Sequence, residues 1–271
     1  MPKKHALLGA SSSARWLVCS PSARLEAQFP DEQSPYAAEG TQAHDLAESI
    51  LRHKLESAKA PAEGNHNNEM LEAVNKYVDI CEEKANEAKA RSVDAEILIE
   101  ARLDFSRWVP EGFGTGDMVI VSDGVLEVID LKFGKGVPVS AVGNTQMRLY
   151  ALGAYDTFEL LYDVHTVRMT IVQPRLDSVS TEELPIEELL AWGNEIIPKA
   201  KAAWEGSGEC TPCDYCNFCK ARHQCRALAD ACLAPFYKYG GKLNQLLTDD
   251  EVAELIGMKD LITKWIKGVY D

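Results

Sequence analysis

The apolar residues of GTGDMVIVSDGVLEVIDLKFGKG, at residues 114–136, predict the two strands of a half-buried β-hairpin, yet three charged residues fall where apolar or neutral ones are expected. They are Asp117, Asp130 and Lys132. Two carboxylates that lie close together repel each other unless a cation lies between them. Hard oxygen ligands suit Mg²⁺ or Mn²⁺, and such an ion lowers the pKa of bound water and neutralises a phosphodiester. With Lys132 to orient that water or stabilise developing charge, the stretch predicts metal-assisted hydrolysis.

The turn of this hairpin decides whether the two carboxylates face each other. A two-residue loop at 123–124 pairs Ser122 with Val125. Counting back along both strands then places Asp117 directly opposite Asp130, with Cβ atoms about 4.5–5.5 Å apart. The lysine follows two residues later and shares the face of the second carboxylate. A three-residue turn would shift the register by one and separate the acids.

Helical and strand patterns on both sides of the hairpin must position these charges. Helical periodicity covers 36–58, 69–90, 140–161 and 185–206, strand patterns cover 94–105 and 165–175, and a last helix starts near 248. We expect Pro198 to bend or interrupt its helix. The order predicts an α/β or α+β fold with a mixed central sheet of three or four strands, flanked by helices.

Length and charge limit the class of protein. The 271 residues allow one large domain, or one domain with a small appendage. The formal net charge of −14 argues against a passive nucleic-acid coat, but it suits an enzyme with a carboxylate-rich metal site. No apolar run reaches the roughly 18 residues that cross a bilayer, and the N-terminus lacks the pattern of a signal peptide. We therefore expect a cytoplasmic protein without membrane contact.

The order of these motifs resembles the PD-(D/E)XK nuclease superfamily. Gly116 and Asp117 are followed, at the end of an apolar strand, by Asp130, Leu131 and Lys132. The resemblance implies a restriction-endonuclease-like core. It also implies that the two aspartates and the backbone carbonyl of Leu131 hold Mg²⁺ or Mn²⁺, with both aspartates and the lysine acting in catalysis.

Two further motifs resemble the RecB/AddB-like branch of that superfamily. AEGTQAHDLAE, at 38–48, resembles a motif in which a helix carries a metal-binding histidine, here His44. QMRLY resembles the Q-x-x-x-Y motif of the next helix, which implies catalytic roles for Gln146 and Tyr150; at this spacing the two share a helix face. Other segments are similar to a phage- and prophage-associated exonuclease-like family, which implies DNA-end processing in a bacterial host cell.

Cysteines are concentrated near the C-terminus. In a reducing cytosol such a CxxC array indicates a metal or cluster site rather than disulfides. AddB-type nucleases carry an iron–sulfur cluster on one N-terminal and three C-terminal cysteines, and the resemblance implies a [4Fe–4S] cluster on Cys19, Cys216, Cys219 and Cys225. Cys210 and Cys213 are absent from that pattern, and they leave open two alternatives, a zinc site or free thiols. The zinc set would be Cys210, Cys213, Cys216 and Cys219.

Four basic residues are candidates for phosphate contacts, although an ordinary solvated surface is the alternative. The acidic net charge also leads us to expect help in DNA engagement from a homo-oligomer or from a single-strand-binding or annealing partner. The candidates are Arg148, Lys135, Lys220 and Arg222.

Taken together, the sequence predicts a metal-dependent DNA nuclease, most simply an exonuclease that processes DNA ends. The alternative is a non-catalytic DNA-binding or complex-assembly protein on a nuclease fold. We expect a nuclease core with an N-terminal helical region at 1–206, and a Cys-rich segment at 207–232 that closes onto Cys19. A helical tail at 233–271 looks short for the family.

Overall fold

The computed structural model describes residues 6–30, 35–60, 67–240 and 246–270. These residues form two compact units, each with a buried core of its own. The first unit takes its described residues from 1–11 and 31–197, and the second from 12–30 and 198–271.

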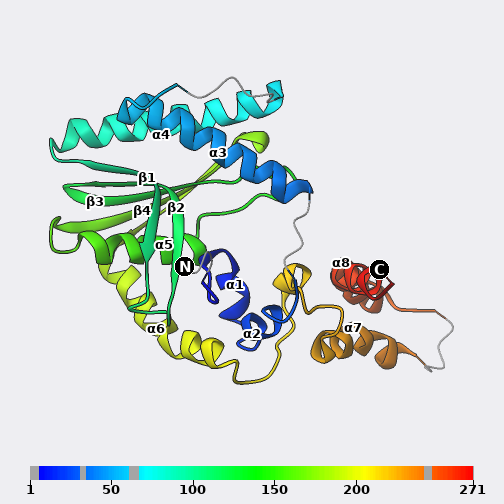
Figure 1. The fold of residues 1–271 in the computed structure, drawn as a ribbon. Coiled ribbons are helices and arrows are strands. Elements are labelled where there is room, and N and C mark those ends of the chain that lie inside the picture. The colour runs from blue at the N-terminus through cyan, green and yellow to red at the C-terminus, as the bar shows by residue number, and fades with distance from the viewer. Residues whose placement is uncertain (1–5, 31–34, 61–66, 241–245, 271) are drawn as a thin grey trace. The chain divides into compact units, whose positions relative to one another are not determined.

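The first unit is built on a mixed sheet (Figure 1). Its strands follow one another in chain order, β1-β2-β3-β4-β5. Only β3 and β4 are parallel, and the other neighbours are antiparallel. A parallel pair needs a crossover connection, which helix α5 (Thr145–Phe158) provides. The strands are β1 (Glu96–Asp104), β2 (Phe113–Ser122), β3 (Gly124–Leu131), β4 (Val164–Gln173) and β5 (Ser178–Pro185).

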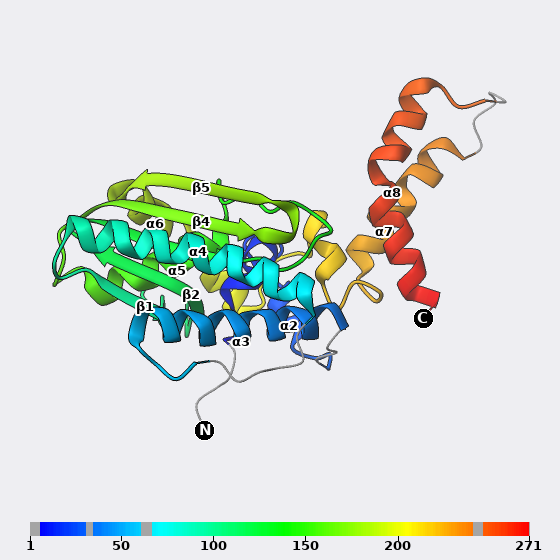
Figure 2. The same cartoon turned by 90° about the horizontal axis from the view of Figure 1, so that it is seen from above.

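Helices α3 (Pro35–Glu56) and α4 (Asn68–Arg91) cover one face of the sheet, where they lie side by side in both ribbon views (Figures 1 and 2). Apolar residues of α3, such as Leu46 and Leu51, are buried in one core with Val78 of α4. That core also contains inward-facing residues of β2 and β3. The pattern of the two helices at 36–58 and 69–90 is thereby confirmed.

Helix α5 and the start of α6 (Ile186–Glu205) lie on the opposite face of the sheet (Figure 1). Helix α5 approaches β1 closely, because a Cβ on Gly153 would lie 3.1 Å from the carbonyl oxygen of Asp104. The helix begins later than its sequence pattern suggests. Asn144 caps it, since its side-chain oxygen accepts the backbone N–H groups of Gln146 and Met147.

The fifth strand was not predicted from the sequence. β5 pairs antiparallel with β4 at the edge of the sheet, and most of its side chains are at least partly exposed. Its sequence, SVSTEELP, is polar and lacks the apolar run by which the other strands were recognised. The chain is thus an α/β protein with a five-stranded mixed sheet in its described part, flanked by helices.

The second unit is helical and carries the Cys-rich region. Cys216, Leu228 and Cys232 form its small buried core, against which Leu261 and Trp265 pack. All eight cysteines of the chain are described, and they are free thiols. Its helices are α1 (Ser13–Trp16), α2 (Ser22–Glu26), the end of α6, the 3₁₀ helix Asp214–Phe218, α7 (Arg226–Tyr239) and α8 (Asp249–Tyr270). Of two further 3₁₀ turns, Pro174–Leu176 belongs to the first unit and Ala10–Ser12 spans the boundary between the units in the sequence.

Among the helices that the structure describes, none has the length and apolar character needed to cross a membrane.

Candidate metal and catalytic site

The hairpin has the predicted register. Ser122 pairs with Val125, and the pairing continues as far as Met118 with Ile129. One further step along both strands brings Asp117 beside Asp130, at the end of the sheet where β3 leads into the loop that follows it.

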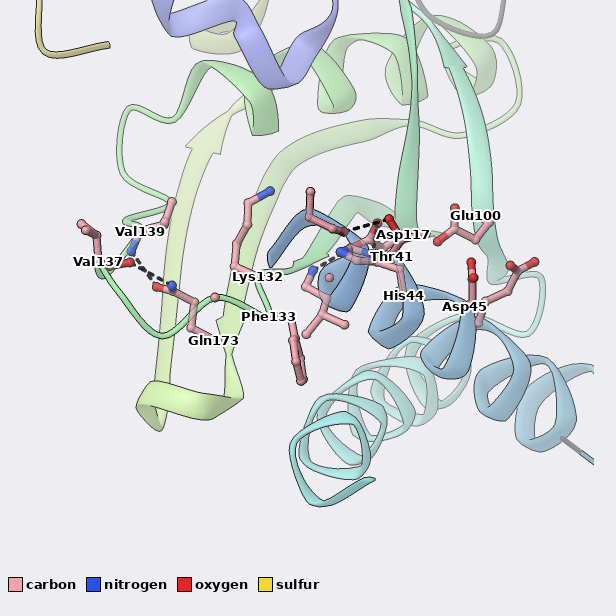
Figure 3. A pocket seen from close by; sticks show the side chains of 15 residues that line it. Thr41, His44, Asp45, Glu100, Asp117, Lys132, Phe133, Val137, Val139 and Gln173 are labelled. Atoms are coloured by element: carbon pink, nitrogen blue, oxygen red, sulfur yellow. Dashed lines mark hydrogen bonds and ion pairs between the residues drawn. The ribbon is translucent and has the colours of Figure 1, made fainter. Parts of the chain in front are cut away.

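Asp117 is held in place by two contacts that use its two carboxylate oxygens separately. Its Oδ2 accepts the backbone N–H of Leu131 at 2.6 Å, which fixes the side chain against the end of β3. Its Oδ1 lies 3.3 Å from Nδ1 of His44, on helix α3 (Figure 3). The strand and the helix thus bring a carboxylate and an imidazole together.

Glu100 completes a group of three ligands. Its position in β1 is opposite Asp117, since Ile99 pairs with Met118 and Ala101 pairs with Gly116. Glu100 also has φ of 52°, in the left-handed region that non-glycine residues rarely adopt.

The three residues offer ligand atoms that all lie within 4.8 Å of one another: His44, Glu100 and Asp117. From the sequence alone, Glu100 is no more than a possible accessory to the site. Extending the strand register from the hairpin to β1 would have placed Glu100 opposite Asp117. The left-handed backbone conformation of Glu100, however, has no recognisable sequence pattern.

The electrostatics of this group suit a cation. Burial, followed by the charge of Asp117, raises the pKa of Glu100 to about 7. Burial lowers the pKa of His44, but its hydrogen bond to Asp117 and the charges of Asp117 and Asp130 outweigh this, so the pKa is raised overall. The carboxylates therefore compete for positive charge, which a divalent ion would supply.

Asp130 and Lys132 form a buried ion pair beside this group. The ammonium of Lys132 lies 2.7 Å from Oδ2 of Asp130. Burial raises the pKa of Asp130 despite the lysine, and the charge of Asp130 raises the pKa of Lys132 despite its burial. The lysine is therefore a cation at neutral pH. Apart from this ion pair, Oδ2 of Asp130 has no hydrogen-bond partner among the described residues, so it has capacity left for a ligand.

Gln146 joins the two members of that ion pair. Its Nε2 donates to Oδ1 of Asp130 at 3.1 Å, and its Oε1 accepts from Nζ of Lys132 at 3.1 Å. The same Nε2 lies 3.4 Å from the hydroxyl of Tyr150, one turn later on α5. The structure thus brings the predicted pair Gln146 and Tyr150 to the charges of the hairpin.

Gly114 explains part of the GTGD sequence. A Cβ at this position would lie 2.6 Å from a ring carbon of Tyr150, so only glycine leaves room for the ring. Burial raises the pKa of the Tyr150 hydroxyl, which is therefore neutral at neutral pH.

A pocket of about 570 Å³ opens over this site. Helix α3 forms one wall with Thr41, His44 and Asp45, and the loop after β3 forms another with Phe133 and Val137 (Figure 3). The three candidate ligand residues and the side chain of Lys132 lie between these walls. The volume is in the range that holds a small ligand.

Gln173, at the end of β4, holds the loop after β3 that forms one wall of the pocket. Its Oε1 accepts the backbone N–H of Val139 at 2.6 Å, and its Nε2 donates to the carbonyl of Val137 at 3.1 Å (Figure 3). The side chain is almost fully buried. The sequence did not indicate this residue, because a lone glutamine at a strand end has no recognisable pattern.

Glu127 lies outside the site, as its position in β3 predicts. It contacts Arg168 and Thr170 of β4, and charges on Lys84 and Glu87 of α4 affect its pKa. The site carboxylate of β3, at the opposite parity, faces α5.

Of the four predicted phosphate-binding residues, the two in the first unit do not line the pocket. Arg148 forms an ion pair with the buried Glu182 at 2.8 Å, and Lys135 is exposed beside Glu69 at 3.3 Å. Both lie in the first unit. In the second unit, Arg222 donates to the carbonyl of Cys219, and Lys220 is half-buried with its backbone N–H bonded to Glu26.

The second unit brings together the cysteines expected to bind a cluster. A small cavity of about 20 Å³ is lined by Cys19, from the N-terminal segment, together with Cys210, Cys216, Cys219 and Cys225. The thiol of Cys210 lies in hydrogen-bonding contact with those of Cys19 and Cys225, so it joins this group. Cys213 instead contacts Cys216, whose Sγ accepts its backbone N–H at 3.3 Å.

Three of these thiols, on Cys210, Cys216 and Cys219, are protonated at neutral pH in the absence of a metal. Burial and neighbouring thiols raise the pKa of Cys210 to about 11, and burial raises the pKa of Cys216 to about 12 and that of Cys219 to about 11. A bound metal would have to displace these protons. Within the described residues, no three cysteines bring their sulfurs as close as the ligand atoms around His44.

Comparison with known proteins gives a family but no activity. A family model described as "Protein of unknown function (DUF2800)" matches residues 5–271. A solved structure titled "Crystal structure of SSO0001" is 14% identical, covers 77% of this chain and 95% of its own, and aligns with a TM-score of 0.28.

Proposed function

The chain belongs to the DUF2800 family, described as proteins of unknown function, and we propose from its site that it is a divalent-metal-dependent deoxyribonuclease. One observation carries the proposal. The ligand atoms of His44, Glu100 and Asp117 lie within 4.8 Å of one another, directly beside the Asp130–Lys132 ion pair. One imidazole and two carboxylates suit Mg²⁺ or Mn²⁺.

Asp130 and the backbone carbonyl of Leu131 complete the ligand set that we propose. The Oδ2 of Asp130 is buried and has no hydrogen bond in the described part of the chain, beyond its ion pair with Lys132. When bound, the ion supplies an activated water and neutralises charge on the phosphodiester.

Lys132 acts on the reacting phosphate as a cation rather than as a base. The charge of Asp130 keeps its pKa raised, so at neutral pH it has no free electron pair with which to accept a proton. Its side chain is only 27% exposed, which strengthens its interaction with a developing negative charge. Lys132 therefore orients the attacking water and stabilises the pentacovalent phosphate.

Gln146 is a positioning residue. It contacts both Asp130 and Lys132, so it sets the distance between the carboxylate and the ammonium. Tyr150 supports Gln146, because its hydroxyl lies 3.4 Å from Nε2 of that residue.

The runner-up function is a DNA-binding or complex-assembly protein that has lost catalysis. The intact set of Asp117, Asp130 and Lys132 speaks against it, because the two carboxylates repel each other in the absence of a metal. The left-handed backbone of Glu100 also lowers the stability of the folded protein. A protein that only binds DNA would not need either feature.

We further propose that the enzyme is an exonuclease that processes DNA ends. The resemblance to phage-associated nucleases supports this, as does a pocket too small for a turn of duplex. The acidic net charge of −14 supports help from a homo-oligomer or from a single-strand-binding or annealing protein. Linear and covalently closed circular DNA test the exonuclease proposal, since an exonuclease degrades only the first.

A [4Fe–4S] cluster on Cys19, Cys216, Cys219 and Cys225 is the cofactor that we propose for the second unit. The small cavity that these four cysteines line together supports the proposal. Zinc on Cys210, Cys213, Cys216 and Cys219 is the alternative. Equal molar amounts of iron and sulfide in the purified protein support the cluster, and one zinc without iron refutes it.

The nuclease proposal is tested by incubating the purified protein with labelled linear DNA in Mg²⁺ or Mn²⁺. Lys132→Met is the diagnostic variant, because methionine keeps most of the length of the side chain but removes its charge. We expect it to lose at least about 100-fold in rate while keeping its affinity for Mn²⁺. Equal rates for the variant and the wild type would remove Lys132 from the mechanism.

A further inference from the structure

Two glycines face the pocket without a structural reason to be glycine. Gly40 lies in the second turn of α3, and Gly134 lies in the loop after β3. A Cβ on either would meet no atom within 4 Å, so no tight packing requires them. Neither has a positive φ, so the backbone conformation does not require them either.

Of the two glycines, Gly40 gives the stronger indication of a binding role, because it lies inside a helix. Glycine inside a helix lowers stability relative to alanine, and this position has room for a side chain. By contrast, Gly114 and Gly153 are each needed for a close contact within the protein. A glycine that faces open space in a pocket is typical of a place where a ligand approaches the backbone closely.

The charges of the pocket limit how a DNA strand could bind there. Lys132 is the one lysine or arginine among its described lining residues, and the acidic ones include Asp45, Glu48 and Glu100. A strand in this pocket cannot be held by a groove of basic side chains. Lys132 and a bound metal ion would supply the positive charge for a strand there, and Gly40 and Gly134 leave the backbone of the walls open to its approach.

We propose that a single DNA strand passes between α3 and the loop after β3, with its sugar–phosphate backbone lying against Gly40 and Gly134. This inference rests on the proposed nuclease function and names the substrate that the site takes, a single strand rather than a duplex. A pocket of about 570 Å³ accommodates about one or two nucleotides.

The chain offers a matched control for each glycine. Gly257, in helix α8, and Gly136, in the loop of Gly134, also have no neighbour within 4 Å of a built Cβ, and neither lines the pocket. We would therefore compare Gly40→Leu with Gly257→Leu, and Gly134→Leu with Gly136→Leu. A side chain at the first position of each pair fills the strand path, whereas neither control position lines the pocket.

The readout is binding of a fluorescein-labelled single-stranded oligonucleotide in Ca²⁺, followed by fluorescence anisotropy. We expect Gly40→Leu and Gly134→Leu to weaken binding at least about tenfold. Their Mn²⁺ affinities, measured by calorimetry, and their melting temperatures should stay at or above those of the wild type. The controls should bind the oligonucleotide normally. Normal binding by Gly40→Leu, or equal binding of a blunt duplex, would overturn the proposal.

The same experiment separates this inference from the proposed function. If the wild type binds single strands through these glycines but cuts no DNA, the nuclease proposal fails and the strand path stands. If the wild type cuts DNA and both pocket variants bind and cut normally, the strand path fails and the nuclease proposal stands. A wild type that binds no oligonucleotide in Ca²⁺ or Mn²⁺ refutes the strand path.

Discussion

Nδ1 of His44 lies 3.3 Å from Oδ1 of Asp117, although one residue is on a helix and the other on a strand that is distant in the sequence. The contact joins α3 to the sheet at the end where β3 leaves it. Oδ2 of Asp117 accepts the backbone N–H of Leu131, so the two contacts together fix the orientation of the carboxylate. The pair supplies two of the three residues whose ligand atoms lie within 4.8 Å of one another.

Replacing His44 should therefore weaken metal binding. We expect His44→Ala to lower the affinity for Mn²⁺ at least about tenfold, measured by isothermal titration calorimetry. The matched control is His53→Ala, which removes an exposed histidine of the same helix that contacts Ala58 instead of the site. Similar losses in both variants would show that the helix, and not the imidazole, matters.

Gln146 should affect catalysis more than substrate binding. Gln146→Ala removes the link between Asp130 and Lys132, and we expect kcat to fall about 10- to 100-fold with little change in KM. Gln146→Glu should be worse, because it places a further carboxylate beside Asp130. A KM effect alone would instead indicate that Gln146 binds the substrate directly.

The fit of Gly114 to Tyr150 predicts a non-additive pair of substitutions. Gly114→Ala places a Cβ 2.6 Å from the tyrosine ring and should destabilise the fold by about 1–3 kcal/mol. In a Tyr150→Ala background, Gly114→Ala should lower the free energy of unfolding much less, because the tyrosine ring is absent. Urea unfolding of the single and double variants gives the coupling energy. Strict additivity would contradict this contact.

Glu127 predicts how stability depends on pH. Burial raises its pKa in the folded state despite the charge of Arg168, so folding favours the protonated form. The stabilisation is fully present below its ordinary pKa of about 4.5 and is lost as the pH rises through the raised value. Between pH 4.5 and 8, the melting temperature of Glu127→Gln should therefore fall by a few degrees less than that of the wild type. A steeper fall in the variant would contradict the assignment.

Cys19 should be required for iron, if the second unit holds a cluster. We expect wild-type protein to be brown, with absorption at about 400 nm, and Cys19→Ser to lose most of its iron. The control is Cys81→Ala, a buried cysteine of α4 in the apolar core of the first unit. Iron retained by Cys19→Ser would instead point to Cys210, whose thiol contacts the same group.

The sequence predicted those parts of the fold and the site that depend on local patterns. The hairpin register followed from the turn after Ser122, and both long helices followed from apolar spacing. Gln146 and Tyr150 followed from a short motif, and the structure places them together. Each of these features is set by residues close to one another along the chain.

What the sequence could not predict depends on tertiary context. The position of Glu100 among the ligands needs the pairing of β1 with β2 and an unusual backbone angle. The ion pair of Arg148 needs β5, which carries Glu182 and which has no clear strand pattern. The grouping of Cys210 with Cys19 needs the folding of the N-terminal segment onto the Cys-rich region.

We propose that one metal-dependent phosphodiesterase site is formed by His44, Glu100, Asp117, Asp130 and Lys132. The most direct test is the release of acid-soluble label from linear DNA by the wild type and by Asp117→Ala, each in Mg²⁺, in Mn²⁺ and in EDTA. We predict release by the wild type with either ion, none in EDTA, and a loss of at least about 100-fold in the variant. Release that persists in EDTA or in Asp117→Ala, or no release by metal-loaded wild type from single- or double-stranded DNA, would contradict the claim.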